Sequence, residues 1–313
     1  MQNFSYHAPA TLGEACALMA EAPDRSRFLA GGSDLHLALE HHAGPVDTVI
    51  DLKRIAGLEG IEETPGGGWR IGALTRMAAL ERHQGLRAAL PALCAAAAVV
   101  GGPPIRNRAT LGGNLCNASP AADTATPLLA FGAQVEVSGG GVPGSNASRT
   151  LALEALWAGP RSTTLRPEEV LTAVVIPPPP TGGGANESTA NESTANESTA
   201  HGNAFARLTR SAMDIALVNA AASLTLDGSG RLASLTVALG AVGATVLSVP
   251  GTDALLGRPV DEALLEDIGK MAETAAQPIT DVRASAEYRR EMAGVMAMRA
   301  VGWAAAPAKG DTP

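Results

Sequence analysis

Two segments with paired glycines are the places where this chain could bind an anion. They are Leu29-Ala-Gly-Gly-Ser-Asp-Leu35 and Thr110-Leu-Gly-Gly-Asn114. Glycine lets backbone N–H groups approach a phosphate without a Cβ in the way, and the hydroxyls of Ser33 and Thr110 add possible donors. Two such loops brought together could hold a pyrophosphate from both sides. Each loop alone is also compatible with an ordinary turn, because the chain has 35 glycines.

Other chemistries lack the residues that they need. The G-x-G-x-x-G pattern at Gly139–Gly144 is followed by loop-like residues rather than a helix, so it does not fit a dinucleotide-binding unit. Cys16, Cys94 and Cys116 are far apart and form no CxxC pair, so we expect no iron–sulfur or zinc site within this chain. We predict neither a catalytic side chain nor a metal-binding set.

Charge and hydropathy narrow the class further. The formal net charge of −8 argues against binding to nucleic acid or to an anionic membrane surface, because both reward clustered Lys and Arg. The apolar run Ala89–Val100 is too short to span a bilayer. The N-terminal residues show no signal-peptide pattern, and the scattered cysteines suit a reducing compartment, so we expect a cytoplasmic protein.

The elements that position the loops follow a mixed α+β pattern. Thr11–Ala22 is predicted to be a helix, with Thr11 as its cap and Glu14 three residues later. Strand Arg27–Leu29 leads into the first loop. Further strands are expected at 48–52, 69–73, 134–137 and 170–176, and further helices at 76–82 and 86–100.

The composition changes after Ile176. Pro177–His201 contains four prolines, three glycines and three copies of Asn-Glu-Ser-Thr-Ala, with few side chains to bury. We therefore predict a flexible linker over 178–203. Strands are predicted at 205–209, 216–226, 232–239 and 245–249, with a hairpin turn at 227–230, and helices at 261–276 and 285–303. This pattern indicates a second domain at 204–305 and a tail at 306–313.

Taken with further motifs, the two loops carry a family resemblance. The additional segments, in chain order, are Ile105–Leu115, Ser119–Asp123, Leu165–Val170, Arg207–Ala216 and Ser285–Arg290. This ordered set resembles the FAD-binding (medium) subunits of molybdenum hydroxylases, among them aerobic carbon monoxide dehydrogenase and xanthine dehydrogenase. The resemblance covers nearly the whole chain except the repeat.

The resemblance implies a fold. The family has a vanillyl-alcohol-oxidase-type (PCMH-type) FAD-binding domain, which would occupy 1–177 with α+β subdomains at about 1–55 and 56–177. An antiparallel sheet with helices would follow in the C-terminal domain of the carbon monoxide dehydrogenase flavoprotein type.

The resemblance also implies roles for individual residues. Asp123 would hydrogen-bond the ribityl or adenosine side of FAD, while Val100 and Leu171 would line the cofactor with apolar surface. Arg207 stands where relatives often carry Lys near the flavin ring, which changes donor geometry but keeps the charge. Ile215 would lie beside the isoalloxazine face. The loops that would enclose the FAD phosphates comprise Leu29, Ala30, Gly31, Gly32, Ser33, Asp34 and Leu35, and Thr110, Leu111, Gly112, Gly113 and Asn114.

Asp34 has a second interpretation from the residues alone, since an Asp after a turn is also typical of a helix N-cap.

The implied function is electron transfer. Such a subunit takes electrons from a partner with two [2Fe-2S] clusters and passes them to NAD or a quinone-type acceptor, while a large partner holds the molybdenum cofactor. The complex would be a heterotrimer or its dimer. Two other classes stay open: a stand-alone FAD-dependent oxidase of a small molecule, and an assembly protein that has lost its flavin. The substrate of the complex and its electron acceptor are not legible in this chain.

Overall fold

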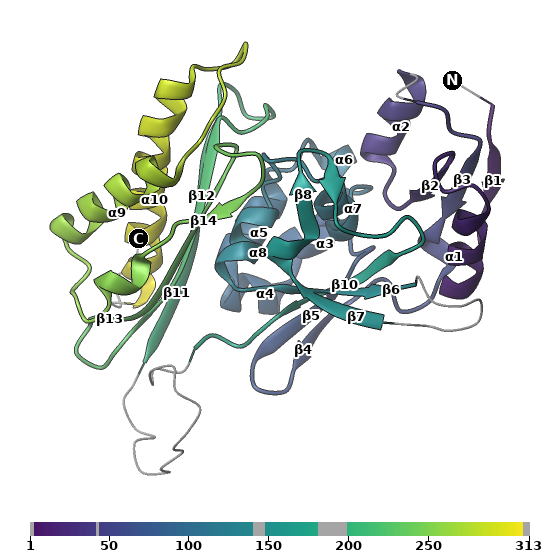
Figure 1. Ribbon diagram of the computed structural model, residues 1–313. Coiled ribbons are helices and arrows are strands. Elements are labelled where there is room, and N and C mark those ends of the chain that lie inside the picture. Colours follow the sequence, from purple (N-terminus) through teal and green to yellow (C-terminus); the bar gives the residue numbers. More distant parts are fainter. Residues whose placement is uncertain (1–2, 42–43, 140–147, 181–198, 309–313) are drawn as a thin grey trace. The chain divides into compact units, whose positions relative to one another are not determined.

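The computed structural model describes residues 3–41, 44–139, 148–180 and 199–308 (Figure 1). The Asn-Glu-Ser-Thr-Ala repeat and most of the Gly139–Gly144 segment lie outside these residues. The chain forms two compact units. The first comprises 1–84, 97–119 and 132–177, and the second comprises 85–96, 120–131 and 178–313. Two segments that precede the linker in sequence thus pack within the second unit.

The first unit contains a parallel sheet of order β1-β3-β2. Its strands are β1 (Ser5–His7), β2 (Ser26–Leu29) and β3 (Thr48–Asp51). Helix α1 (Leu12–Glu21) follows β1, and the Thr11 hydroxyl accepts the Glu14 N–H at 3.2 Å, so the predicted cap is confirmed. Because the strands are parallel, the first glycine loop leaves the same edge of the sheet at which β3 ends.

A second, antiparallel sheet in this unit has the order β4-β5-β10-β6-β7. The central strand β10 (Val170–Ile176) is almost entirely buried, as its continuous apolar run predicts. The other strands of the unit are β4 (Ile61–Thr64), β5 (Gly68–Gly72), β6 (Gln134–Ser138), β7 (Ser148–Ala152), β8 (Trp157–Gly159) and β9 (Ser162–Thr163). Its shorter helices are η1 (Leu52–Arg54), α3 (Met77–Arg82), α6 (Pro103–Arg106), α7 (Leu111–Cys116) and η2 (Leu153–Leu156).

Two local predictions are wrong. The single helix expected at 86–100 is broken into α4 (Gln84–Ala89) and α5 (Pro91–Ala98), because proline lacks the N–H that a continuous helix needs and suits a helix start. The N-cap interpretation of Asp34 also fails. Gly32 occupies the cap of α2 (Ser33–Glu40), and Asp34 lies inside the first turn.

The second unit is built on an antiparallel sheet of order β11-β12-β13-β14. The Asp227 carboxylate accepts the backbone N–H of Ser229 and of Arg231 and so shapes the predicted hairpin turn. Its elements are α8 (Ala125–Ala130), β11 (Ala200–Leu208), β12 (Val218–Leu226), β13 (Leu232–Gly240), β14 (Leu247–Ser248), η3 (Thr252–Leu255), α9 (Glu262–Ala275) and α10 (Ala286–Ala308).

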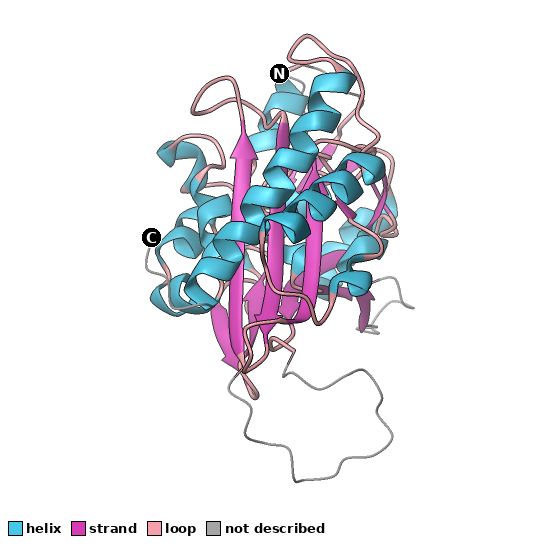
Figure 2. Cartoon of the chain, turned by 90° about the vertical axis from the view of Figure 1, so that its left-hand side faces the viewer, coloured by secondary structure: helices cyan, strands magenta, loops and turns pink. Residues whose placement is uncertain are grey.

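Helices cover the sheet of the second unit (Figure 2). Helix α10 packs on β11 and β12 and against α9, and its buried Ala297, Ala300 and Val301 belong to the same core as Val218 and Leu224 of β12. The predicted C-terminal arrangement of antiparallel strands followed by helices is confirmed. Strand β11 begins at Ala200, earlier than expected, because backbone pairing with β12 extends it through residues with few apolar side chains.

Among the described residues, no helix combines the length and the apolar character needed to cross a membrane.

Candidate functional site

The first glycine loop ends in a helix start without a side-chain cap. Gly32 has φ +84°, a left-handed conformation that residues with a Cβ adopt only with strain, and α2 begins at the next residue. Gly32 has no side chain, so the N-cap position offers no side-chain hydrogen-bond acceptor to the first turn of α2. The N–H groups of Ser33, Asp34 and Leu35 point out of the helix end, where phosphate binds favourably.

The second glycine loop has its backbone donors already engaged. Thr110 caps α7, and its hydroxyl accepts the N–H of Gly113 at 3.2 Å. The N–H groups of Leu111 and Gly112 donate to two carbonyls just after β5, at 2.9 and 2.8 Å. This loop can therefore offer a cofactor its shape and side chains, and fewer backbone N–H groups than the first loop.

The two loops lie against each other within the first unit. A Cβ built on Gly31 would collide with the backbone carbonyl of Arg108, just before the second loop. A Cβ on Gly113 would lie 3.7 Å from the Cβ of Ala30. The structure thus brings together the two loops that the sequence singled out, and Gly31 is required for that close approach.

Apolar residues predicted to line the cofactor occupy ordinary packing positions. Leu171 is buried in β10, and Val100 is half-buried just after α5. Leu29 and Leu35 of the first loop pack on a small core cluster that includes Leu39. Their contribution to a cofactor site stays a prediction.

In the second unit, Asp123 and Arg207 form a buried ion pair. The Arg207 Nε donates to the Asp123 Oδ1 at 3.0 Å, and the two side chains are 11 % and 9 % exposed. The Asn219 amide donates to the same oxygen at 2.9 Å, and the Thr126 hydroxyl donates to the Asn219 Oδ1 at 2.7 Å. Burial raises the pKa of Asp123, and the charge of Arg207 offsets part of that rise.

Arg207 also fixes the loop that carries Ile215. Its Nη2 donates to the Asp214 carbonyl at 2.6 Å, and the Asp214 carboxylate accepts the Ile215 N–H at 2.8 Å. The Ile215 side chain is half exposed, so it presents an apolar surface. Asp123, Arg207 and Ile215 are therefore linked by one set of hydrogen bonds.

The predicted residues divide between the two units. The glycine loops, Val100 and Leu171 belong to the first unit, and Asp123, Arg207 and Ile215 belong to the second.

Sequence reasoning missed two polar residues that contact predicted site residues, Asn219 and Lys53. Asn219 is fully buried, and its signal was an amide inside the apolar run of β12. Lys53 donates to the carbonyl of Ala30 in the first loop, and nothing in the local pattern marked it. Both contacts join residues distant in sequence, so they become visible only once the strands are paired.

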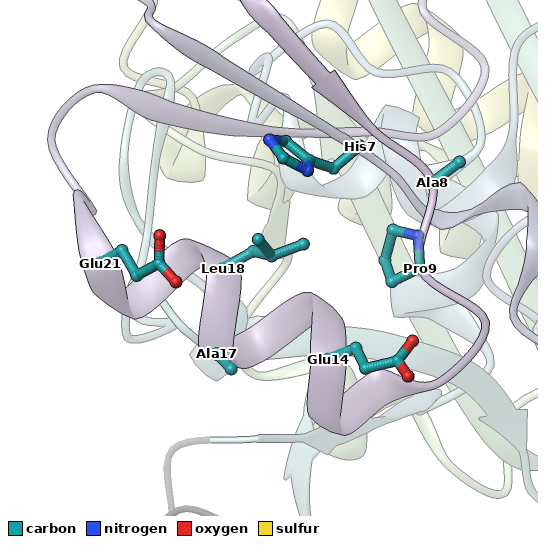
Figure 3. Close-up of a pocket in the computed structure, with 7 residues that line it drawn as sticks. All are labelled: His7, Ala8, Pro9, Glu14, Ala17, Leu18 and Glu21. Atoms are coloured by element: carbon teal, nitrogen blue, oxygen red, sulfur yellow. The ribbon is translucent and has the colours of Figure 1, made fainter.

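A cavity of about 430 Å³ lies elsewhere in the first unit, between β1 and α1 (Figure 3). It contains none of the predicted site residues. Its lining is formed by His7, Ala8, Pro9, Glu14, Ala17, Leu18 and Glu21. Within the described ranges, no group of three or more His, Cys, Asp or Glu side chains is arranged to hold a metal ion.

Family comparisons agree with both parts of the chain. The family described as the FAD binding domain in molybdopterin dehydrogenase matches residues 2–179. The family described as the CO dehydrogenase flavoprotein C-terminal domain matches residues 203–304.

Full-length relatives show the same likeness. The chain is 33 % identical over 308 residues to the xanthine dehydrogenase FAD-binding subunit of Escherichia coli O157:H7, covering 98 % of this chain and 97 % of the relative. It is 33 % identical over 308 residues to the carbon monoxide dehydrogenase medium chain of Afipia carboxidovorans, covering 98 % of both.

A solved structure of reconstituted CO dehydrogenase from Oligotropha carboxidovorans superposes with a TM-score of 0.85 at 33 % identity, covering 97 % of this chain and 98 % of that chain. These comparisons and the fold define a flavoprotein of the molybdenum hydroxylases. The chain belongs to the family of FAD-binding subunits that includes the carbon monoxide dehydrogenase medium chain and the xanthine dehydrogenase FAD-binding subunit.

Proposed function

We propose that this subunit binds FAD and serves as the electron exit of a molybdenum hydroxylase. Bound FAD would supply the redox chemistry, taking electrons from the iron–sulfur clusters of a partner and giving them to NAD or a quinone-type acceptor. The observation that carries the proposal is the uncapped start of α2, held against the second glycine loop. The chain's own task is to bind and orient the cofactor.

The first loop suits the pyrophosphate of FAD. The backbone N–H groups at the start of α2 are directed donors, and the helix dipole favours a negative charge there. The second loop supports this arrangement by close packing, since Gly31 lies directly on the backbone before Thr110. The residues present therefore fit the phosphate part of FAD.

The second unit offers a fixed cation with a paired carboxylate. Arg207 is held by the Asp123 carboxylate and by the Asp214 carbonyl, so its guanidinium has a defined orientation. We assign Arg207 to the flavin end of the cofactor, with the exposed side of Ile215 against the ring, as in the family resemblance. Asp123 would act there mainly by holding Arg207, because its Oδ1 accepts from both Arg207 and Asn219.

Partners are part of the proposal. Relatives of this chain are named medium chains and FAD-binding subunits, which implies further chains in their enzymes. Cys16, Cys94 and Cys116 are too few and too scattered for two clusters. We assign the clusters to a small subunit and the molybdenum cofactor to a large one, in a heterotrimer or its dimer.

The binding test places a negative charge at the first loop. In the full chain, Ser33→Asp should leave α2 intact, because an acid suits a helix N-terminus, but should repel the FAD pyrophosphate. The matched control is Ser285→Asp, since Ser285 lies at another helix start and accepts the Tyr288 N–H at 3.2 Å. Weaker FAD binding in Ser33→Asp alone supports the proposal, and equal FAD affinity in both variants contradicts it.

The partner test is affinity purification of the tagged chain from its native host, followed by flavin, iron and molybdenum analysis. Co-purification with two chains that carry iron–sulfur clusters and molybdenum supports the electron-transfer role. Flavin without partners, together with direct substrate oxidation, would favour a stand-alone oxidase.

A further inference from the structure

Lys53 contacts the backbone of the first glycine loop. Its Nζ donates to the carbonyl of Ala30 at 3.1 Å and lies 2.7 Å from the Asp51 Oδ1. Ala30 immediately precedes Gly31. The Lys53 ammonium therefore holds the peptide group that joins Ala30 to Gly31.

In the parallel sheet, β3 lies between β1 and β2 (Figure 1). Asp51 is paired with Leu29 at the carboxyl ends of β3 and β2, so the residue after each strand emerges at the same edge. Tyr6 of the neighbouring strand β1 donates its hydroxyl to the Asp51 Oδ2. Asp51 thus links Tyr6 on one side to Lys53 on the other.

Asp51 is a buried anion, and both of its carboxylate oxygens accept hydrogen bonds. It is 5 % exposed, and its Oδ1 also accepts the backbone N–H of Lys53 at 3.0 Å. Burial by itself would raise its pKa, but the hydrogen bonds from Lys53 and Tyr6 outweigh this and leave the pKa below its usual value. Asp51 is therefore a charged anchor at neutral pH, and Lys53 is held in place by it.

Peptide geometry gives this contact a consequence for binding. In a trans peptide, the C=O and the N–H point to opposite sides of the bond. Because the Ala30 carbonyl points to Lys53, the Gly31 N–H points away from it. In the described part of the chain, the Gly31 N–H has no hydrogen-bond acceptor, although Gly31 is buried. A buried donor of this kind is costly unless a ligand satisfies it.

We propose that Tyr6, Asp51 and Lys53 form a positioning relay that aims the Gly31 N–H at the pyrophosphate of FAD. The Gly31 N–H would join the N–H groups at the start of α2 as phosphate donors. Lys53 is a positioning residue in this scheme, since it acts through the Ala30–Gly31 peptide. The inference rests on the proposed FAD function and adds the residues that set its phosphate affinity.

The test compares ligands that differ in their phosphate content. Dissociation constants of FAD, ADP and riboflavin are measured on the full-length apo chain for wild type and for Lys53→Met. We expect FAD and ADP to bind roughly 10- to 100-fold more weakly, as for the loss of an aligned hydrogen bond to a charged group, while riboflavin affinity stays unchanged. Lys270→Met is the matched control, because Lys270 is an exposed lysine on α9 in the second unit.

Two further variants keep the test decisive. The first is the double variant that combines Asp51→Asn with Lys53→Met. It has no unpaired buried carboxylate, so it should fold, and it should still bind FAD and ADP more weakly than the wild type. Asp51→Asn alone separates the relay from direct phosphate binding by Lys53. The relay predicts weaker FAD binding, because Lys53 loses its anchor, whereas direct binding predicts unchanged or tighter binding, because Lys53 loses a competing anion.

The outcomes distinguish a failure of the relay from a failure of the proposed function. A wild-type chain that binds FAD and a Lys53→Met variant with the same FAD and ADP affinity would overturn the relay alone. Equal losses for FAD, ADP and riboflavin in the double variant would mean that the residues are merely structural, which also overturns it. A wild-type chain that binds no FAD would overturn the proposed function, and the relay with it.

Discussion

The two glycine loops of the first unit have similar sequences and different local structures. The first ends in a helix whose N-cap, Gly32, has no side chain to accept from the N–H groups of the first turn. The second ends in α7, which is capped by Thr110, and its backbone donors are bonded to the chain itself. The first loop thus lacks a side-chain cap at its helix start, whereas the second loop is held by hydrogen bonds to its own chain.

The difference shows that a paired-glycine motif has no single role. At Gly31 and at Gly112, a Cβ would collide with the neighbouring backbone, so both glycines are needed for close packing. Gly32 serves the left-handed turn that starts α2. Phosphate binding then depends on whether the N–H groups of the loop already have acceptors in the chain, and in the second loop the Thr110 hydroxyl and the carbonyls of Ala73 and Thr75 accept them.

The largest expected effect comes from separating the two loops. Gly31→Ala places a Cβ on the Arg108 carbonyl, which is backbone and cannot move aside cheaply. We expect the free energy of unfolding to fall by about 3 kcal/mol, with loss of FAD binding, measured by denaturant unfolding and flavin titration. The control is Gly13→Ala, which meets nothing within 4 Å in α1. Similar stability in the two variants would show that the loops are not in contact.

Acid should weaken the first loop selectively. The pKa of Asp51 lies below its ordinary 3.8, so its stabilising effect is present above that pH and is lost as the pH falls through the lower folded value. A charged hydrogen bond of this kind contributes about 2 kcal/mol.

The measurement is FAD affinity of wild type and Asp51→Asn as the pH falls from neutral to below 3.8. Asp51→Asn should already bind FAD weakly at neutral pH, and its FAD affinity should not fall further in acid. If the FAD affinities of wild type and Asp51→Asn fall in parallel as the pH is lowered, Asp51 is not the group whose protonation weakens FAD binding. Thr110→Ala, which changes a neutral cap, should reduce affinity by the same factor at each pH.

The turn that starts α2 should cost less to disturb. Gly32→Ala places a Cβ 3.0 Å from the Leu29 Cδ1, the end of a flexible side chain, and imposes φ +84° on a residue with a Cβ, a conformation that costs roughly 1–2 kcal/mol. We expect that loss in unfolding free energy, with FAD binding weakened but measurable. A variant as unstable as Gly31→Ala would mean that Gly32 is also a packing residue.

The smallest effects distinguish the two hydroxyls. Thr110→Ala removes a cap and should cost about 1 kcal/mol of unfolding free energy. Ser33→Ala should change that energy by less than about 0.5 kcal/mol, because the Ser33 hydroxyl donates only to the exposed Asp34. Its FAD affinity should nonetheless fall if the hydroxyl is a phosphate donor. Equal stability losses would remove the distinction between the loops.

The features that the sequence predicted correctly depend on interactions between residues that are close together in the chain. Strand β10 matches its predicted bounds, and the cap of α1 was read correctly, because an apolar run and a Thr-x-x-Glu pattern act over a few residues. The break between α4 and α5 at Leu90 is also a local effect, because Pro91 is the first residue of α5. The start of α2 was missed, because glycine is a weak cap signal and Asp34 was a plausible alternative.

Interactions between distant residues were out of reach. Lys53 meets Ala30 only because β2 and β3 pair in parallel with Leu29 opposite Asp51, and register between strands leaves no mark in either strand. Asn219 was visible as an odd polar residue in β12, but its partners Asp123 and Thr126 lie in a segment that joins the second unit from far upstream.

By itself, the sequence determined the α+β class, the hairpins and helices of the second unit, and the two glycine loops, since each depends on local periodicity or on the missing Cβ of glycine. The tertiary structure alone decided which loop keeps its donors open, which carboxylate anchors Lys53, and which cation Asp123 holds. Those outcomes depend on strand register and on burial, because a buried charge or donor takes whichever partner the fold brings within hydrogen-bonding distance.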